Sequence, residues 1–200
     1  QPRSRGLGDV YKRQVQSGEI TDLTAPMWSS LVYHMPAGKH PALKVTWNDG
    51  MKDGKPNKPE RHPDIPEATF DKAGSGMMFI GTDGVIFEGD AYCASPVIYP
   101  QEKYTQVRLD MKAGKIKKTE TRSVMPNNPQ GEWAHHIVNG GLPSSNFDYS
   151  CPLTEFVLLG NLAVRSQQMV QWDTKAMKVT NVEAANKFVS RPSYREGYTA

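Results

Sequence analysis

The chain has 200 residues, of which 38% are hydrophobic and 22% are charged, an ordinary globular composition that suffices for one sizeable core. The formal net charge is only +3, with 24 basic residues spread among 21 acidic ones, so we expect no continuous basic face and no nucleic-acid partner. No apolar run approaches the roughly 20 residues that cross a bilayer, so no membrane partner is expected either. One main domain is predicted.

The first fourteen residues do not read as part of a fold. QPRSRGLG is basic and lacks apolar periodicity, and DVYKRQ matches the in-frame translation of a transposase recognition end used in DNA library preparation. We therefore exclude residues 1–14 as a non-native leader. Residues 15–200 are taken as one domain whose gene continued upstream of Val15. A natural basic arm is the alternative interpretation.

Two strands are predicted in the next segment of the chain. Apolar residues lie near alternating positions in MWSSLVYHMP, and in ALKVTWNDG the side chains of Leu43, Val45 and Trp47 share one face. The intervening AGKHP is long enough for a hairpin loop, so the two strands should pair, and residues 48–50 predict a turn after the second. Residues 51–73, rich in proline and charge, should form an exposed loop.

Shorter strands are expected after this loop. GMMFIGTDGVIFEGD predicts a hairpin in which residues 78–81 and 85–88 flank the turn TDG. Residues 96–99 should add another short strand. Residues 102–121 alternate weakly, which suggests a further hairpin around residues 113–114.

Helices are predicted in the C-terminal half. PQGEWAHHIVNGG is typical of a short helix that Gly140 and Gly141 can end. FDYSCPLTEFVLLGNLAVR predicts a longer helix with Asp148 or Ser150 as its cap and Pro152 in its first turn, so apolar that most sides should be buried. MVQWD returns as a strand, and EAANKFVS as a short helix. The sum is an α+β fold, with a predominantly antiparallel open sheet packed on a few helices.

Few residues form a recognisable catalytic or metal-binding pattern. There is no HExxH, no GxSxG and no complete GxGxxG. His135 and His136 would point about 100° apart on a helix, which does not suit one metal ion. Cys93 and Cys151 form no CxxC pair and are interpreted as buried free thiols. The pattern therefore assigns no catalytic residue and no metal ligand.

An ordered series of short motifs nevertheless runs through the C-terminal half. The motifs are NFDY (146–149), PLTE (152–155), LGN (159–161), WD (172–173), KVTN (178–181), AN (185–186) and YR (194–195). Together with TAPMWSSLVYHMPA, LKVTWNDG and GMMFIGTDGVIFEGD, they resemble the C-terminal domain of bacterial Gfo/Idh/MocA oxidoreductases. The resemblance extends from about Thr24 to Tyr198.

This resemblance implies a two-domain enzyme. An N-terminal Rossmann domain would bind NAD or NADP, and a C-terminal α/β domain would cover a sugar-like substrate with its open sheet and mediate homo-oligomers. Only the second domain has a counterpart here, so no catalytic or cofactor-binding residue is carried over, and the chain alone should neither bind NAD(P) nor catalyse a reaction. The parent enzyme would transfer hydride at a carbinol carbon of a sugar or cyclitol. The alternatives are an NAD-dependent glycoside hydrolase of the same family and a stand-alone carbohydrate-binding or assembly module.

Seven side chains are candidates for contact with a carbohydrate, because an aromatic face beside hydrogen-bonding groups suits a polyol. They are Trp28, Trp47, Asn48, Asp49, Asn146, Asp148 and Tyr149. The last three could equally cap the long helix and fix its preceding loop. The face that would pack on a Rossmann domain should also leave apolar area uncovered, which predicts poor solubility of the isolated chain.

Overall fold

The computed structural model describes residues 11–21, 23–38, 41–117, 123–190, 193 and 196–198, and only the backbone of residues 11–14. The contacts divide the chain into two compact units. The first comprises the described parts of residues 1–59 and 125–200, and the second comprises those of residues 60–124. Each unit has its own cluster of buried apolar side chains.

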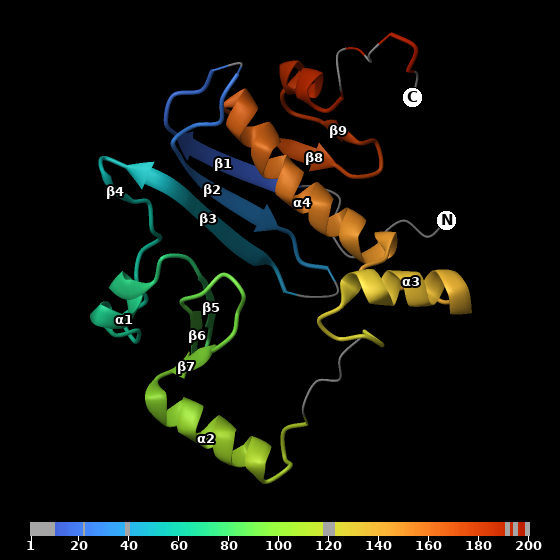
Figure 1. The fold of residues 1–200 in the computed structure, drawn as a ribbon. Coiled ribbons are helices and arrows are strands. Elements are labelled where there is room, and N and C mark those ends of the chain that lie inside the picture. The colour runs from blue at the N-terminus through green and yellow to red at the C-terminus, as the bar shows by residue number, and fades with distance from the viewer. Residues whose placement is uncertain are drawn as a thin grey trace. The chain divides into compact units, whose positions relative to one another are not determined.

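The first unit is built on a six-stranded antiparallel sheet of described residues in the order β4-β3-β2-β1-β8-β9 (Figure 1). The strands are β1 (Tyr11–Ser17), β2 (Trp28–Met35), β3 (Leu43–Lys52), β4 (Lys55–Pro56), β8 (Gln171–Asp173) and β9 (Lys178–Val179). The strands predicted in MWSSLVYHMP and ALKVTWNDG correspond to β2 and β3, and their predicted pairing is confirmed. Their register sets Leu31 opposite Trp47 and Ser30 opposite Asn48.

Strand β1 was missed by the sequence analysis. The exclusion of residues 11–14 from the fold is wrong for their backbone, because these residues begin β1 and pair with both β2 and β8. Sheet pairing uses backbone N–H and C=O groups that nearly every residue has, so it does not require an apolar pattern. The non-native origin of the leader stays a prediction, and residues 1–10 lie outside the described part of the chain.

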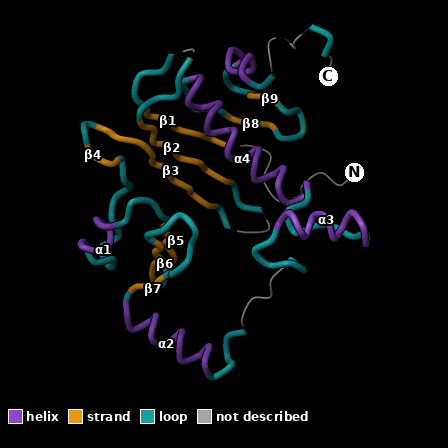
Figure 2. The backbone as a smooth tube through the Cα atoms, in the orientation of Figure 1, coloured by secondary structure: helices purple, strands orange, loops and turns teal. Residues whose placement is uncertain are grey.

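Strand β3 continues through the segment that was predicted as a turn. The chain reverses between β3 and β4 (Figure 2). The residues of this turn are Asp53 and Gly54, whose φ angles are 52° and 74°. Two consecutive positive φ angles are typical of the tightest hairpin turns. Gly50 serves a different purpose, since a Cβ there would lie 2.0 Å from the carbonyl oxygen of Met27.

Helix α4 (Phe147–Ser166) lies across one face of this sheet (Figure 1). Its cap is Asn146, whose side chain accepts a hydrogen bond from the backbone N–H of Asp148, so the predicted cap at Asp148 or Ser150 is wrong. The helix begins early enough that Pro152 falls in its second turn, not its first.

The two sides of α4 differ in burial. Leu153, Val157 and Leu158 are each 54% exposed, so the predicted burial on most sides is wrong. The sheet side of α4 joins the strands in a core cluster of seven buried residues, namely Leu159, Leu162, Ala163, Val170, Trp172, Val179 and Ala185. One helix face therefore stabilises the sheet, while the other remains uncovered.

Two shorter helices complete the first unit. The predicted short helix is confirmed as α3 (Pro129–Asn139), capped by Asn128 and followed by Gly140 with a φ of 75°. The predicted EAANKFVS helix corresponds to the 3-10 helix η1 (Glu183–Phe188). Residues 194–195, which carry the last motif, lie outside the described residues.

The second unit holds a three-stranded antiparallel sheet, β5 (Met77–Gly81), β6 (Gly84–Glu88) and β7 (Val97–Tyr99), as predicted. Its core is formed by Ile65, Val85, Phe87 and Tyr99. The predicted loop at 51–73 is wrong in part, because it also contains β4, the buried Ile65 and helix α1 (Glu67–Lys72).

A helix replaces the hairpin that was suggested for residues 102–121. Helix α2 (Gln101–Lys112) spans most of that segment (Figure 2), and residues 118–121 lie outside the described part. Its Gln, Glu, Lys, Arg, Leu and Met residues are strong helix formers, and none of its side chains is buried. The described residues thus form antiparallel open sheets with a few helices, the coarse fold class predicted. No helix among them is long and apolar enough to span a membrane.

Candidate functional site

The β2–β3 pair has two faces of different character. Residues directly opposite each other in an antiparallel pair point to the same face, so Leu31 and Tyr33 share a face with Trp47 and Val45. Helix α4 packs on this face, where the ring of Phe156 stacks on Tyr33 with centroids 4.3 Å apart. The alternate residues of both strands point to the opposite face, which α4 does not cover.

Three side chains form a hydrogen-bonded group on that opposite face. They are Ser30, Asn48 and Asn57, which we call the amide cluster, and all three are half-buried. Ser30 Oγ donates to Asn48 Oδ1 at 2.9 Å, and Asn57 Nδ2 donates to Ser30 Oγ at 3.1 Å. Asn57 Nδ2 also donates to the carbonyl oxygens of Ser29, at 2.8 Å, and Asp49, at 3.1 Å. Asn57 thereby joins the end of β3 to β2.

Trp28 lies on the same face as the amide cluster, two residues before Ser30 along β2. Its ring is half-buried, and the Nζ atom of Lys52 lies 4.4 Å from the ring centroid. Gly50 is the residue opposite Trp28, so the β3 side chain beside the indole comes from Lys52, two residues further along the strand. The structure therefore brings two of the predicted contact residues, Trp28 and Asn48, onto one surface.

Trp47 and Asp49 lie on the other face, with α4. The Asp49 carboxylate accepts hydrogen bonds from the backbone N–H and the Oγ of Ser29, both at 2.7 Å, and from Trp47 Nε1 at 3.0 Å. This carboxylate thus holds the sheet register and orients the indole. Trp47 remains 56% exposed, in an apolar stripe with Leu43 and Met51 on the same strand.

Of the three candidates at the start of α4, one has a structural task and two are exposed on the surface. Asn146 caps the helix, and its Nδ2 donates to the carbonyl oxygen of Pro143 at 2.9 Å, so the capping interpretation holds for this residue. Asp148 and Tyr149 are exposed.

The loop before α4 is fixed by a residue that sequence reasoning did not select. Glu132 is 2% exposed, and its carboxylate accepts from the backbone N–H of Ser144 at 3.0 Å and from Ser144 Oγ at 2.8 Å. Buried carboxylates need such donors, since desolvation without them costs several kcal/mol. Glu132 therefore has a structural task in the 143–146 loop.

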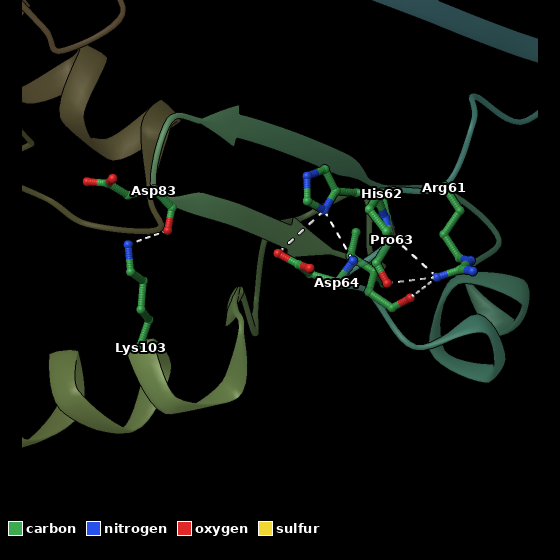
Figure 3. Close-up of polar contacts among 7 residues, drawn as sticks. Arg61, His62, Pro63, Asp64, Asp83 and Lys103 are labelled. Carbon is green, nitrogen blue, oxygen red and sulfur yellow. Dashed lines mark hydrogen bonds and ion pairs between the residues drawn. The ribbon is translucent and has the colours of Figure 1, made fainter.

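Polar contacts in the second unit also serve local structure (Figure 3). The Arg61 guanidinium donates to the carbonyl oxygens of His62, Pro63 and Ile65, and the Asp64 N–H donates to His62 Nδ1 at 3.3 Å. These bonds form a tight turn that places Ile65 in the core. Lys103 Nζ donates to the carbonyl oxygen of Asp83 and ties α2 to the β5–β6 turn (Figure 3).

The cysteines and the histidine pair show no arrangement typical of catalysis. Cys93 and Cys151 are both free and exposed, so their predicted burial is wrong: Cys93 occupies a turn with a φ of 53°, and Cys151 lies on the uncovered side of α4. His136 Nδ1 lies 2.9 Å from the carbonyl oxygen of Gly140 at the helix end. Among the residues that the structure describes, no three His, Cys, Asp or Glu side chains gather as a metal site would require.

The amide cluster with Trp28 is therefore the surface in the described residues best suited to a polar ligand. Two of its members, Ser30 and Asn57, were missed, because Asn57 lies 27 residues from Ser30 in a segment predicted to be an exposed loop. No protein-family model and no curated protein matched the chain in the comparisons.

Proposed function

We propose that this chain is the C-terminal domain of a bacterial NAD(P)-dependent oxidoreductase of the Gfo/Idh/MocA type. The parent enzyme acts on a sugar, cyclitol or related carbohydrate by hydride transfer, and this domain binds the substrate and forms homo-oligomers through its sheet. The sequence motifs carry the proposal, and the tasks of the motif residues in the structure support it.

The motif residues hold one block of the first unit together. Trp172 Nε1 donates to Glu155 of α4 at 2.6 Å. Asn181 accepts from the backbone N–H of Gln171 and donates to the backbone before β8, both at 2.7 Å, and Asn186 makes two bonds to the backbone of Val179, at 2.8 and 3.0 Å. The side chains of Trp172, Asn181 and Asn186 thus link α4, β8, β9 and η1 by hydrogen bonds, which is the kind of task expected of residues in a family motif.

The glycine-rich segment at residues 74–76 does not have the form of a dinucleotide phosphate cradle. A phosphate cradle needs a glycine-rich turn that opens a helix, so that backbone N–H groups and the helix dipole face the pyrophosphate. Gly74 and Gly76 precede the β5–β6 hairpin instead. In the proposed enzyme a separate Rossmann domain binds NAD(P) and carries the catalytic groups, and this chain contributes the polar surface for the carbohydrate.

The first test is to sequence the source DNA through the codon for Val15 with long reads. The proposal expects an in-frame strand, glycine-rich turn and helix upstream. A start codon just upstream, with DVYKRQ intact, would instead favour a stand-alone carbohydrate-binding module. A tight NAD(H) titration signal from the isolated chain would contradict the proposed division of tasks.

Assays of the parent protein then distinguish hydride transfer from NAD-dependent glycoside hydrolysis. A hydride-transfer enzyme should form NAD(P)H stoichiometrically with oxidised carbohydrate. An NAD-dependent glycoside hydrolase should release the leaving group of an aryl glycoside without net accumulation of NADH, because its oxidation is transient.

A further inference from the structure

We propose that the amide cluster binds two neighbouring hydroxyl groups of a carbohydrate, with Asn48 Nδ2 as hydrogen-bond donor and Asn57 Oδ1 as acceptor. This inference rests on the proposed function for the class of ligand, and it adds the binding atoms and two residues, Ser30 and Asn57, that the sequence did not indicate.

The orientation of the Asn57 amide follows from its partners. Its nitrogen faces two backbone carbonyl oxygens, those of Ser29 and Asp49, and carbonyl oxygens can only accept. The opposite assignment would set three oxygens against one another. Asn57 Nδ2 is therefore the inner atom, and Oδ1 is left with only a 3.5 Å contact, to Ser30 Oγ.

The Ser30 hydroxyl in turn determines the orientation of the Asn48 amide. Ser30 Oγ accepts from Asn57 Nδ2, and its own proton is donated to the nearer acceptor, Asn48 Oδ1 at 2.9 Å. Asn48 therefore turns its oxygen inward, and its Nδ2 has no partner among the described residues. The Ser30 hydroxyl thus lies between a free donor, Asn48 Nδ2, and an available acceptor, Asn57 Oδ1.

A pair of this kind matches neighbouring hydroxyl groups. Each hydroxyl can donate one hydrogen bond and accept others, so one can donate to Asn57 Oδ1 while the next accepts from Asn48 Nδ2. Both protein atoms belong to side chains already ordered by hydrogen bonds, so little further conformational entropy is lost on binding. Half-burial of the cluster also reduces competition from water.

Trp28 gives the surface an apolar part at the right spacing. Residues i and i+2 of a strand lie on one face about 6.6 to 6.8 Å apart, about the width of a six-membered sugar ring. A ring whose hydroxyls reach the amide cluster can therefore place its C–H groups beside the exposed part of the indole, whose ring Lys52 Nζ also approaches to 4.4 Å from the centroid. Sites that combine an aromatic surface with a few fixed polar groups are typical of small polar ligands.

The test uses the full 200-residue chain labelled with ¹⁵N. It is titrated with myo-inositol and, as the control without neighbouring hydroxyls, with cyclohexanol. The side-chain NH₂ signals of Asn48 should shift with myo-inositol and not with cyclohexanol. The variant Asn48→Asp removes the donor but keeps an oxygen for Ser30, and should weaken myo-inositol binding about tenfold or more. Asn161→Asp, the same change at an exposed position of α4, should bind within about twofold of the unchanged chain.

Binding that survives Asn48→Asp undiminished would overturn the assignment of the diol site while leaving the proposed function in place. Absence of any shift with myo-inositol, D-glucose and D-mannitol would overturn the inference as well, and the upstream DNA would decide the proposed function independently. If Asn48→Asp does not fold, intermolecular NOEs in the unchanged chain decide: contacts from myo-inositol to the Asn48 amide and the Trp28 ring support the site, and their absence refutes it.

Discussion

Two neighbouring leucines of α4 provide the sharpest test of how the helix packs. Leu159 is 3% exposed and belongs to the core cluster, whereas Leu158 is 54% exposed. Truncation to alanine removes the same atoms at both positions. Leu159→Ala should lower the free energy of unfolding by about 2 to 5 kcal/mol, because a lost transfer term and a cavity add together. Leu158→Ala should cost about 1 kcal/mol or less, because no closed cavity forms.

Urea unfolding followed by tryptophan fluorescence measures this difference in one unit only. The chain has four tryptophans, and all of them, Trp28, Trp47, Trp133 and Trp172, lie in the first unit. The signal therefore reports on the unit that contains α4, even if the second unit unfolds separately. The two variants should differ in midpoint and share one slope with the unchanged chain.

An equal loss for both variants would refute the packing described for α4. It would mean that Leu158 is covered in solution. If a second copy of the chain covers it, the urea midpoint of the unchanged chain should rise with protein concentration, since self-association stabilises the folded form. A midpoint independent of concentration, together with equal losses, would place another part of the chain over the outer side of the helix.

Three further results are expected. Gly50→Ala should destabilise the first unit by several kcal/mol, because its Cβ would meet a carbonyl oxygen at 2.0 Å, whereas Gly54→Ala, also at positive φ but in open space, should cost only about 1 kcal/mol in the same urea titration. Cys93 and Cys151 should both react with a thiol reagent in the folded protein without denaturant, since both are exposed; a single fast thiol would contradict that exposure. Deletion of residues 1–14 should expose the backbone of β8 to hydrogen exchange, because it removes both described register pairs between β1 and β8; unchanged protection there would show that residues 11–14 of β1 are dispensable.

Elements with strong local signals were predictable from the sequence. The β5–β6 hairpin follows from a Thr-Asp-Gly turn between apolar runs, and α4 follows from its length and apolar content. Helix α2 was missed because no side chain in it is buried, so no apolar stripe marks its period. Strand β1 was missed because its place in the sheet comes from backbone pairing with β2 and β8, which leaves no apolar pattern in the sequence.

The candidate site was predictable only in part for a related reason. Trp28 and Asn48 were selected by residue type, but Trp47 and Asp49 were grouped with them although they point to the opposite face. The predicted turn at residues 48–50 removed Asn48 and Asp49 from the strand. The actual turn lies at Asp53 and Gly54, so both residues belong to β3 and their side chains point to opposite faces of the sheet. Asn57 carries no local signal, since its function comes from bonds across the sheet edge.

The contrast between the two faces of the sheet also bears on how binding relates to stability. The α4 face holds Leu31, Tyr33 and the core cluster, so substitutions there act mainly on folding. The opposite face carries Lys44 and Lys52 and also the shorter polar side chains of Ser30, Asn48 and Asn57. Short amides already fixed by hydrogen bonds lose little entropy when a ligand binds, and the outward Nδ2 of Asn48 contributes no bond to the fold. Loss of that one donor should therefore weaken ligand binding while the urea midpoint stays unchanged, a separation that a purely structural asparagine would not show.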